Sequence, residues 1–78
     1  MSNFEAMAKE IVAGVGGQEN IEAVTNCMTR LRFTLKDVKK ADENTLKNIK
    51  GVQGVVNKNG QFQVVIGTSV PEVCAEIK

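Results

Sequence analysis

The feature that most constrains the fold is a strict alternation of apolar and polar side chains over residues 30–36. The apolar positions are Leu31, Phe33 and Leu35, and the polar positions are Arg30, Arg32, Thr34 and Lys36. Because successive strand residues point to opposite faces of a sheet, this pattern predicts a strand with one buried face and one face in water. Such a strand is typical of an antiparallel sheet that is covered on one side only.

The rest of the chain supplies the other elements of such a fold. A second strand is expected over residues 21–26. The apolar runs 52–56 and 62–66 flank a turn expected over residues 57–60, in which Asn59-Gly60 is a strong hairpin signal. Apolar residues at helical spacing predict three helices, with caps at Ser2, Asp42 and Ser69. The predicted fold class is therefore α+β, a four-stranded antiparallel sheet with helices packed on one face, in the order α-β-β-α-β-β-α.

Length and hydropathy indicate how the chain is organised. The 78 residues predict a single domain, residues 1–78, without a linker. The apolar pattern of the last helix still continues at Lys78, so we expect this domain to be part of a longer chain. The longest uncharged run, residues 59–71, is too short and too polar to cross a membrane, and no signal-peptide pattern opens the sequence. These features predict a cytoplasmic domain without direct membrane insertion.

The chain contains no histidine, tryptophan or tyrosine. Without histidine, imidazole acid–base chemistry and histidine metal ligands are excluded, and two cysteines are too few for a structural zinc site. We therefore expect neither a metal nor a cofactor. The net charge of +1 argues against nucleic acid as a partner. Residues 30–58 nevertheless carry eight of the ten basic side chains and form a candidate anion-facing region.

The two cysteines have different predicted environments. Cys74 lies on the apolar stripe of the last helix, where a buried thiol behaves as a small apolar side chain. Cys27 lies in a polar turn close to Arg30 and Arg32, and a neighbouring guanidinium favours the reactive thiolate form. Neither a second cysteine nor a base is close to it in the sequence, which argues against dithiol redox and hydrolase chemistry.

The groups around Cys27 are those that bind a phosphate. Arginine binds phosphate oxygens through two parallel hydrogen bonds, and the N–H groups of a turn form an anion nest. Arg30 and Arg32 share one face of the predicted strand, so both can reach the same oxyanion. The alternative, in which they are only solvent-facing charges of an amphipathic strand, stays open on these residues alone.

Residues 26–32, Asn-Cys-Met-Thr-Arg-Leu-Arg, resemble the phosphocysteine motif of IIB domains in the glucose/sucrose superfamily of the bacterial phosphoenolpyruvate-dependent sugar phosphotransferase system. Further segments resemble the same family, namely Val15-Gly16-Gly17 with Asn20-Ile21, Gly51–Val55 and Gln61–Gly67. The resemblance covers essentially the whole chain. It implies the same α+β fold and an enzyme, a phosphotransferase component that carries phosphate on a cysteine.

The resemblance also implies site residues and partners. Cys27 is the expected phosphorylated nucleophile, and the expected phosphate site consists of Asn26, Met28, Thr29, Arg30 and Arg32. Such domains accept the phosphoryl group from a phosphohistidine of a IIA domain and pass it to a sugar held by the IIC membrane domain. The expected location is the cytoplasmic side of the bacterial cell membrane. Glucoside, sucrose, trehalose and N-acetylmuramate types all agree with the sequence.

Two other functions agree with parts of the sequence. Residues 51–54, Gly-Val-Gln-Gly, follow two lysines and have the spacing of an RNA-binding backbone clamp. The near-neutral charge and the scarcity of aromatic residues favour instead a glycine that ends a helix and a glycine that begins a strand. The second alternative is a ligand-sensing or interaction module of similar α+β layout, which would tolerate the loss of Cys27.

Overall fold

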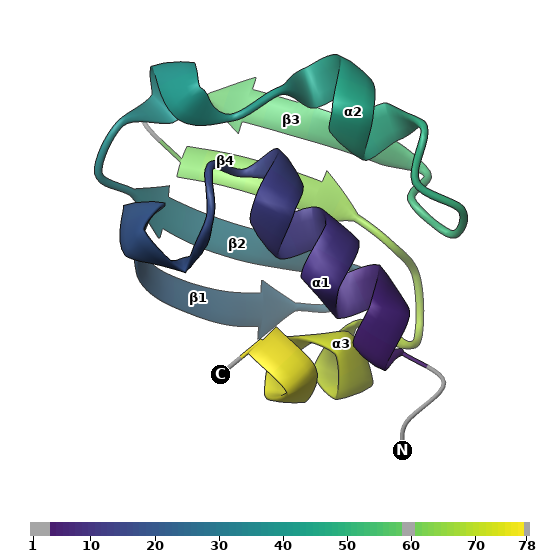
Figure 1. Cartoon of the computed structure of the whole chain (residues 1–78). Helices are drawn as coiled ribbons and strands as arrows, with labels where there is room; N and C mark the ends of the chain where they lie inside the picture. Colours follow the sequence, from purple (N-terminus) through teal and green to yellow (C-terminus); the bar gives the residue numbers. More distant parts are fainter. Residues whose placement is uncertain (1–3, 59–60, 78) are drawn as a thin grey trace.

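Within residues 4–58 and 61–77, which the computed structural model describes, the chain forms a four-stranded antiparallel sheet covered on one face by three α-helices (Figure 1). The elements, in which η denotes a short 3-10 helix, are α1 (Glu5–Gly14), η1 (Gln18–Asn20), β1 (Ile21–Cys27), β2 (Arg30–Leu35), η2 (Val38–Lys40), α2 (Glu43–Lys47), β3 (Gly54–Lys58), β4 (Gln61–Val65) and α3 (Val70–Ile77). The strand order is β1-β2-β4-β3, so β2 and β4 are central. The predicted α+β class and element order are confirmed.

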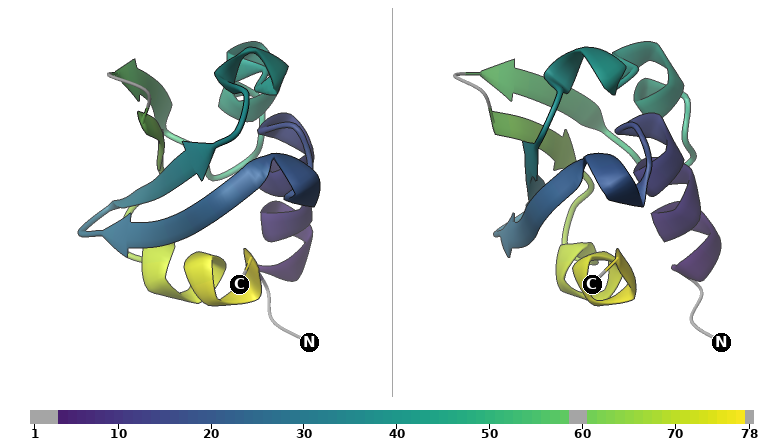
Figure 2. Two further views of the ribbon diagram at one scale, coloured as in Figure 1. Left: turned by 90° about the vertical axis from the view of Figure 1, so that its left-hand side faces the viewer. Right: turned by 60° about the vertical axis from the view of Figure 1, so that its left-hand side comes forward.

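The core lies between the helices and one face of the sheet. Phe33 of β2 and Phe62 of β4 are directly opposite each other, and both are almost completely buried. The helices and the link after α1 add Ala8, Ile11, Val15, Leu46, Val70, Val73, Cys74 and Ile77. Figure 2 shows α1, α2 and α3 on the same side of the twisted sheet, which leaves the other face of the central strands open. The sheet therefore has one apolar and one polar face, as the alternation predicts.

Two glycines follow helix α1 and its cap residue Val15, and a third, Gly14, is the last residue of the helix and packs closely on α2. Gly16 and Gly17 have φ values of 105° and 92°, a conformation that other residues rarely adopt. The N–H of Gly17 donates to the carbonyl of Val12 at 2.8 Å, which closes the helix end as predicted. A Cβ added to Gly14 would lie 2.6 Å from a methyl carbon of the fully buried Leu46. Gly14 therefore sets how closely α1 and α2 approach.

A buried asparagine joins the end of α1 to the link that follows β2. The side-chain nitrogen of Asn20 donates to the carbonyl oxygens of Val15 and Asp37 at 2.8 and 2.9 Å, and its side-chain oxygen accepts from the N–H of Asp37 at 2.9 Å. Its backbone carbonyl also accepts from the N–H of Lys36. Asn20 is only 3% exposed, and both ends of its amide are hydrogen-bonded, so its burial leaves no polar group unpaired.

Some element ends differ from the sequence predictions. β1 extends one residue further, to Cys27, because its pairing with β2 continues as far as Arg30. β3 begins at Gly54 rather than at Val52, whose N–H donates instead to the carbonyl of Ile49 in a turn. The 3-10 helices η1 and η2 were not predicted. None of the helices within the described residues is long and apolar enough to span a membrane.

The predicted caps and the second hairpin turn have mixed outcomes. Asp42 caps α2 as predicted, because its carboxylate accepts the N–H groups of Asn44 and Thr45 at 3.0 and 3.2 Å. Ser69 directly precedes α3, and its backbone carbonyl accepts the N–H groups of Glu72 and Val73 at 3.1 and 3.2 Å, while capping by its side chain stays a prediction. Ser2 and the Asn59-Gly60 turn lie outside the described residues. β3 runs through Asn57 and Lys58, which were predicted to belong to the turn, because both residues pair with β4.

Candidate functional site

The candidate site lies at the closed end of the β1–β2 hairpin. β1 ends with Cys27 and β2 begins with Arg30, and these two residues are direct cross-strand partners. Met28 and Thr29 form the two-residue turn between them. Cys27 therefore occupies the last strand position beside the turn, where its side chain is exposed while its backbone is held by the sheet.

Strand alternation puts Cys27 and both arginines on the open face of the sheet. Leu31 is completely buried on the helix side, so its neighbours Arg30 and Arg32 point to the opposite face. Cys27 is paired with Arg30, and directly opposed residues of an antiparallel sheet lie on the same face. The thiol and the two guanidinium groups thus belong to one surface.

A shallow hollow of about 340 Å³ joins these side chains. It is lined by Cys27, Met28, Thr29, Arg30, Arg32 and Gln63. Five of the six residues expected from the sequence therefore meet in one place. Asn26 does not line the hollow. It is paired with Leu31, so its side chain, although exposed, lies on the opposite face of the sheet.

Two glutamines of β4 orient the arginine side chains. Arg30 donates from Nη1 to Oε1 of Gln63 at 3.0 Å, and Arg32 donates from Nη2 to Oε1 of Gln61 at 2.6 Å. An amide oxygen is neutral, so it fixes a guanidinium without cancelling its charge, and each guanidinium has five N–H donors. Both arginines therefore keep their charge and further donors for a ligand.

These glutamines were not among the predicted site residues. Their alternation with Phe62 and Val64 places Gln61 and Gln63 on a polar strand face, and this much is visible in the sequence. The sequence alone does not show that β4 lies beside β2, because the two strands belong to different hairpins. That long-range pairing sets Gln63 opposite Arg32 and brings both amides to the arginines.

The turn beside Cys27 is held by the segment that follows β4. The carbonyl of Thr29 accepts the N–H groups of Ile66 and Gly67 at 2.8 and 3.0 Å. Gly67 has a φ of 122°, which glycine adopts without steric cost. Because the turn is bonded both within its own hairpin and to this segment, the hollow is formed before any ligand arrives.

The hollow carries uncompensated positive charge. Among residues 4–58 and 61–77, the single salt bridge joins Lys9 to Glu5 on α1 at 3.4 Å, so no carboxylate of this part of the chain is paired with Arg30 or Arg32. The same residues contain no group of three or more His, Cys, Asp or Glu side chains placed to hold a metal ion. The arrangement is suited to binding an anion next to a thiol.

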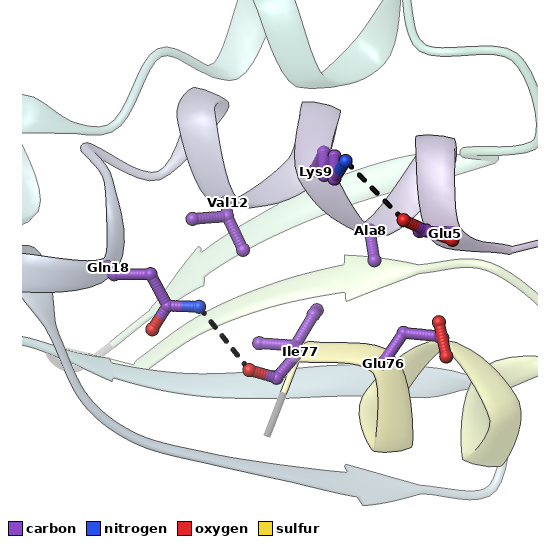
Figure 3. A pocket seen from close by; sticks show the side chains of 7 residues that line it. All are labelled: Glu5, Ala8, Lys9, Val12, Gln18, Glu76 and Ile77. Atoms are coloured by element: carbon purple, nitrogen blue, oxygen red, sulfur yellow. Dashed lines mark hydrogen bonds and ion pairs between the residues drawn. The ribbon is translucent and has the colours of Figure 1, made fainter.

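A second hollow lies between α1 and α3 (Figure 3). It measures about 400 Å³ and is lined by Glu5, Ala8, Lys9, Val12, Gln18, Glu76 and Ile77. Its polar groups are partly paired with one another, since Lys9 binds Glu5 and the side-chain nitrogen of Gln18 donates to the carbonyl of Ile77 at 3.4 Å. These lining residues include neither cysteine nor arginine, so the chemistry predicted for Cys27 has no counterpart there.

The glycines of the alternative RNA-clamp segment have structural roles. Gly51 has a φ of 101° in the turn that follows α2, and Gly54 begins β3. This is the arrangement expected for one glycine that ends a helix and another that begins a strand.

Comparison with known proteins connects this fold to one family. The family model described as phosphotransferase system, EIIB matches residues 9–42, which include β1, the turn and β2. A crystal structure of one domain of the PTS system, IIabc component from Clostridium difficile, is similar with a TM-score of 0.85 and 31% sequence identity. The match covers 95% of this chain and 78% of that one.

Curated relatives are much longer than this chain. The PTS system beta-glucoside-specific EIIBCA component of Halalkalibacterium halodurans is 49% identical over 95% of this chain, which covers 12% of that protein. The arbutin-, cellobiose-, and salicin-specific EIIBC component of Escherichia coli is 49% identical over 96% of the chain, and the chain covers 16% of it. The trehalose-specific EIIBC component of Bacillus subtilis is 50% identical over 99% of the chain, with 17% of that relative covered.

The fold and these matches define the class of protein, a small α+β domain of phosphotransferase systems. The chain belongs to the phosphotransferase system EIIB family, in its glucose, beta-glucoside and sucrose type, and is a phosphotransferase component of that family. The resemblance inferred from residues 26–32 is thereby confirmed. The chain spans less than a fifth of the length of each of the three curated relatives named above.

Proposed function

We propose that Cys27 carries a phosphoryl group from a phosphohistidine of a IIA domain to a sugar held by a IIC membrane domain. The observation that carries this proposal is the hollow, where an exposed thiol stands beside two arginines that no described carboxylate neutralises. Phosphoryl transfer needs in-line positioning and charge stabilisation more than covalent help from the protein. This chain contains no histidine, and it meets both requirements with the position of the thiol and with the charge of the two arginines.

Each residue of the hollow has a proposed part in holding the phosphoryl group. Arg30 binds two of its oxygens through the planar guanidinium, and Arg32 stabilises the charge that develops during transfer to the sugar. The hydroxyl of Thr29 and the backbone of the turn, including Met28, bind the remaining oxygens. Asn26 contributes through its backbone, because its side chain belongs to the other face of the sheet.

The two transfers balance without a cofactor. In the first, the Cys27 thiolate attacks phosphorus, the S–P bond forms, the N–P bond of the phosphohistidine breaks, and the released imidazole takes up a proton. In the second, a sugar hydroxyl oxygen attacks the same phosphorus, the O–P bond forms and the S–P bond breaks. The thiolate is regenerated, and the hydroxyl proton passes to a base on the acceptor, since this chain has no histidine to receive it.

The parent protein is proposed to be a membrane permease in which residues 1–78 form the phosphocarrier domain. The names EIIBC and EIIBCA of the relatives, and the small share of each that this chain covers, support further domains in the same polypeptide. The domain then works at the cytoplasmic side of the bacterial cell membrane. Neither a nucleic acid nor direct insertion into the membrane has a part in this mechanism.

Sugar selection is proposed to lie outside this domain. Relatives named for beta-glucosides and for trehalose are 49% and 50% identical to this chain. The sequence of this domain is therefore about equally similar to relatives that are named for different sugars. The hollow at Cys27 is shallow and is lined by charged and polar groups around the thiol, which suits a phosphoryl group better than a sugar ring.

The proposal is tested by intact-mass analysis after incubation with a phosphorylated IIA domain taken from an EIIBCA relative. The wild-type chain should gain one phosphoryl group, and Cys27→Ser should gain none while keeping its fold. Cys74→Ala is the matched control, since it removes the other thiol and should still be phosphorylated. Normal labelling of Cys27→Ser would contradict the proposal, because the phosphoryl group would then be carried by another residue.

A further inference from the structure

Met28 is the large apolar side chain that the described fold leaves in water. It is 88% exposed, whereas the other large apolar residues of the described chain are buried or partly buried. Leaving such a side chain in water forgoes the gain that burial of a methionine provides. The exposure alone is an ordinary surface feature, so a second observation is required.

The backbone of Met28 supplies that second observation. Its φ is 52°, and Met28 is the single described residue other than glycine with a positive φ. In two-residue hairpin turns such positions are occupied mostly by glycine or asparagine, because a Cβ there is sterically unfavourable. Met28 is therefore an unfavourable residue here for two reasons: its backbone has a positive φ, and its apolar side chain is exposed to water. Unfavourable conformations of this kind cluster where a protein binds or reacts.

Met28 lies beside the thiol of the candidate site. Met28 directly follows Cys27 and lines the same hollow, so anything that approaches the thiol in this hollow meets the methionine. Its neighbour Thr29 is anchored to Ile66 and Gly67, which makes the turn a fixed platform rather than a loose loop. Methionine is enriched at protein interfaces because its flexible, polarisable side chain adapts to apolar surfaces.

We infer that Met28 is a docking contact for the protein that donates the phosphoryl group, and that it inserts into an apolar surface around the donor's phosphorylated side chain. This inference rests on the proposed function. The names of the three curated relatives, EIIBCA and EIIBC, combine B and C in one component every time, but only one of these names also includes A. A tethered acceptor has a high effective concentration, but a donor on a separate chain must be captured by surface affinity alone.

The experiment measures the initial rate of Cys27 phosphorylation against the concentration of a separately supplied, phosphorylated IIA domain. Met28→Asn removes the apolar side chain and suits a positive φ, and Met28→Leu restores apolar bulk. Both substitutions keep the backbone through which Met28 is proposed to bind the phosphoryl group, so they change its side chain only. We expect Met28→Asn to raise the KM for the donor about tenfold with kcat within about twofold, a change that corresponds to the loss of a partly buried apolar contact. Met28→Leu should stay within about threefold of the wild type.

Two controls separate this inference from its premise. Intact mass shows whether wild-type Cys27 accepts phosphate at all, and failure there overturns the proposed function and this inference with it. Alkylation of Cys27 by iodoacetamide should be equally fast in Met28→Asn and in the wild type, which shows that the thiol is unaltered. If the wild type is phosphorylated and Met28→Asn leaves the donor KM unchanged, only the docking role is overturned. A defect confined to sugar phosphorylation overturns it equally.

Discussion

The two cysteines of this chain place the same side chain in opposite surroundings. Cys27 ends an edge strand on the polar face of the sheet and is exposed, whereas Cys74 lies on α3 and is only 2% exposed in the core. Both are free thiols. A side chain at the end of a strand, beside a turn, can contact a partner protein. A side chain on the buried face of a packed helix cannot. The access that a partner has to each thiol therefore follows from the position of the cysteine in the fold.

The largest expected difference between the cysteines is their reactivity in the native state. Cys27 should react freely with iodoacetamide, whereas Cys74 can react only when the structure opens. We expect the alkylation rate of Cys74 to be at least about 10³-fold lower than that of Cys27. Mass mapping of alkylated peptides over time measures both rates. Phosphorylation by the IIA donor should protect Cys27 alone. Comparable labelling of both thiols without denaturant would remove the basis of the comparison.

The next largest effect is expected from Arg30, because this arginine lies beside Cys27, whereas the surroundings of Cys74 are apolar. Arg30→Lys keeps the positive charge beside Cys27 but loses the planar pair of donors, including the bond to Gln63. We expect transfer to sugar to fall about 10²-fold, the usual cost of removing one well-placed donor to a developing charge. Steady-state sugar phosphorylation by the proposed parent permease measures this rate.

Lys47→Arg is the matched control for this substitution, because it exchanges the same two cationic side chains at an exposed position on α2. It should leave the rate of sugar phosphorylation unchanged. Equal rates for the wild type and Arg30→Lys would show that charge alone is sufficient and that the guanidinium plane has no special part.

A smaller effect, on stability rather than activity, is expected at the buried thiol. Cys74→Ser places a hydroxyl where the surroundings are apolar, and burying it without a partner should lower the free energy of unfolding by about 1–3 kcal/mol. Urea denaturation measures the change, and Cys74→Ala separates the lost volume from the added polarity. Both variants should still accept phosphate below their unfolding midpoints. Loss of phosphorylation in a folded Cys74 variant would give this thiol a functional role after all.

The sequence predicts local features of this molecule well because they depend on local periodicity. The alternation over residues 30–36 and the helical spacing of the apolar residues give the elements and their buried faces. The pairing of β2 with β4 could not be predicted in the same way, because it depends on packing Phe33 against Phe62 across two hairpins. Gln61 and Gln63 come to the arginines only through that pairing, and so they were missed.

Two further differences have equally physical causes. Asn26 was grouped with its neighbours in the motif, but β1 runs on to Cys27, and strand alternation then turns the Asn26 side chain to the other face. The 3-10 helices η1 and η2 adjoin the hydrogen bonds of Asn20 to Asp37, 17 residues away. A bond of that range leaves no periodic pattern in the sequence.

The smallest predicted effect tests whether exposure by itself marks a functional side chain. Asp42 is exposed like Cys27, yet its carboxylate is structural, because it accepts the N–H groups of Thr45 and Asn44 at the start of α2. These bonds, led by the one from Thr45, lower the pKa of Asp42 below its ordinary value. A lowered pKa in the folded state means that its stabilising effect is complete above the unfolded pKa and is lost as the pH falls through the folded one.

Asp42→Asn should therefore reduce Tm slightly at pH 7. The difference from the wild type should shrink once the pH falls below the ordinary pKa of an unfolded aspartate, about 4, and should vanish as the pH falls through the lower pKa of the folded state. Asparagine is about as good an N-cap as aspartate but carries no charge, so the variant isolates the charge from the cap. Thermal unfolding followed by circular dichroism from pH 7 to strongly acidic solution measures the difference. Phosphorylation of Cys27 at neutral pH should be unchanged. A Tm difference that does not vary with pH would show that the cap acts through shape alone. Convergence at acid pH would show that the charge of Asp42, although exposed, stabilises the start of α2.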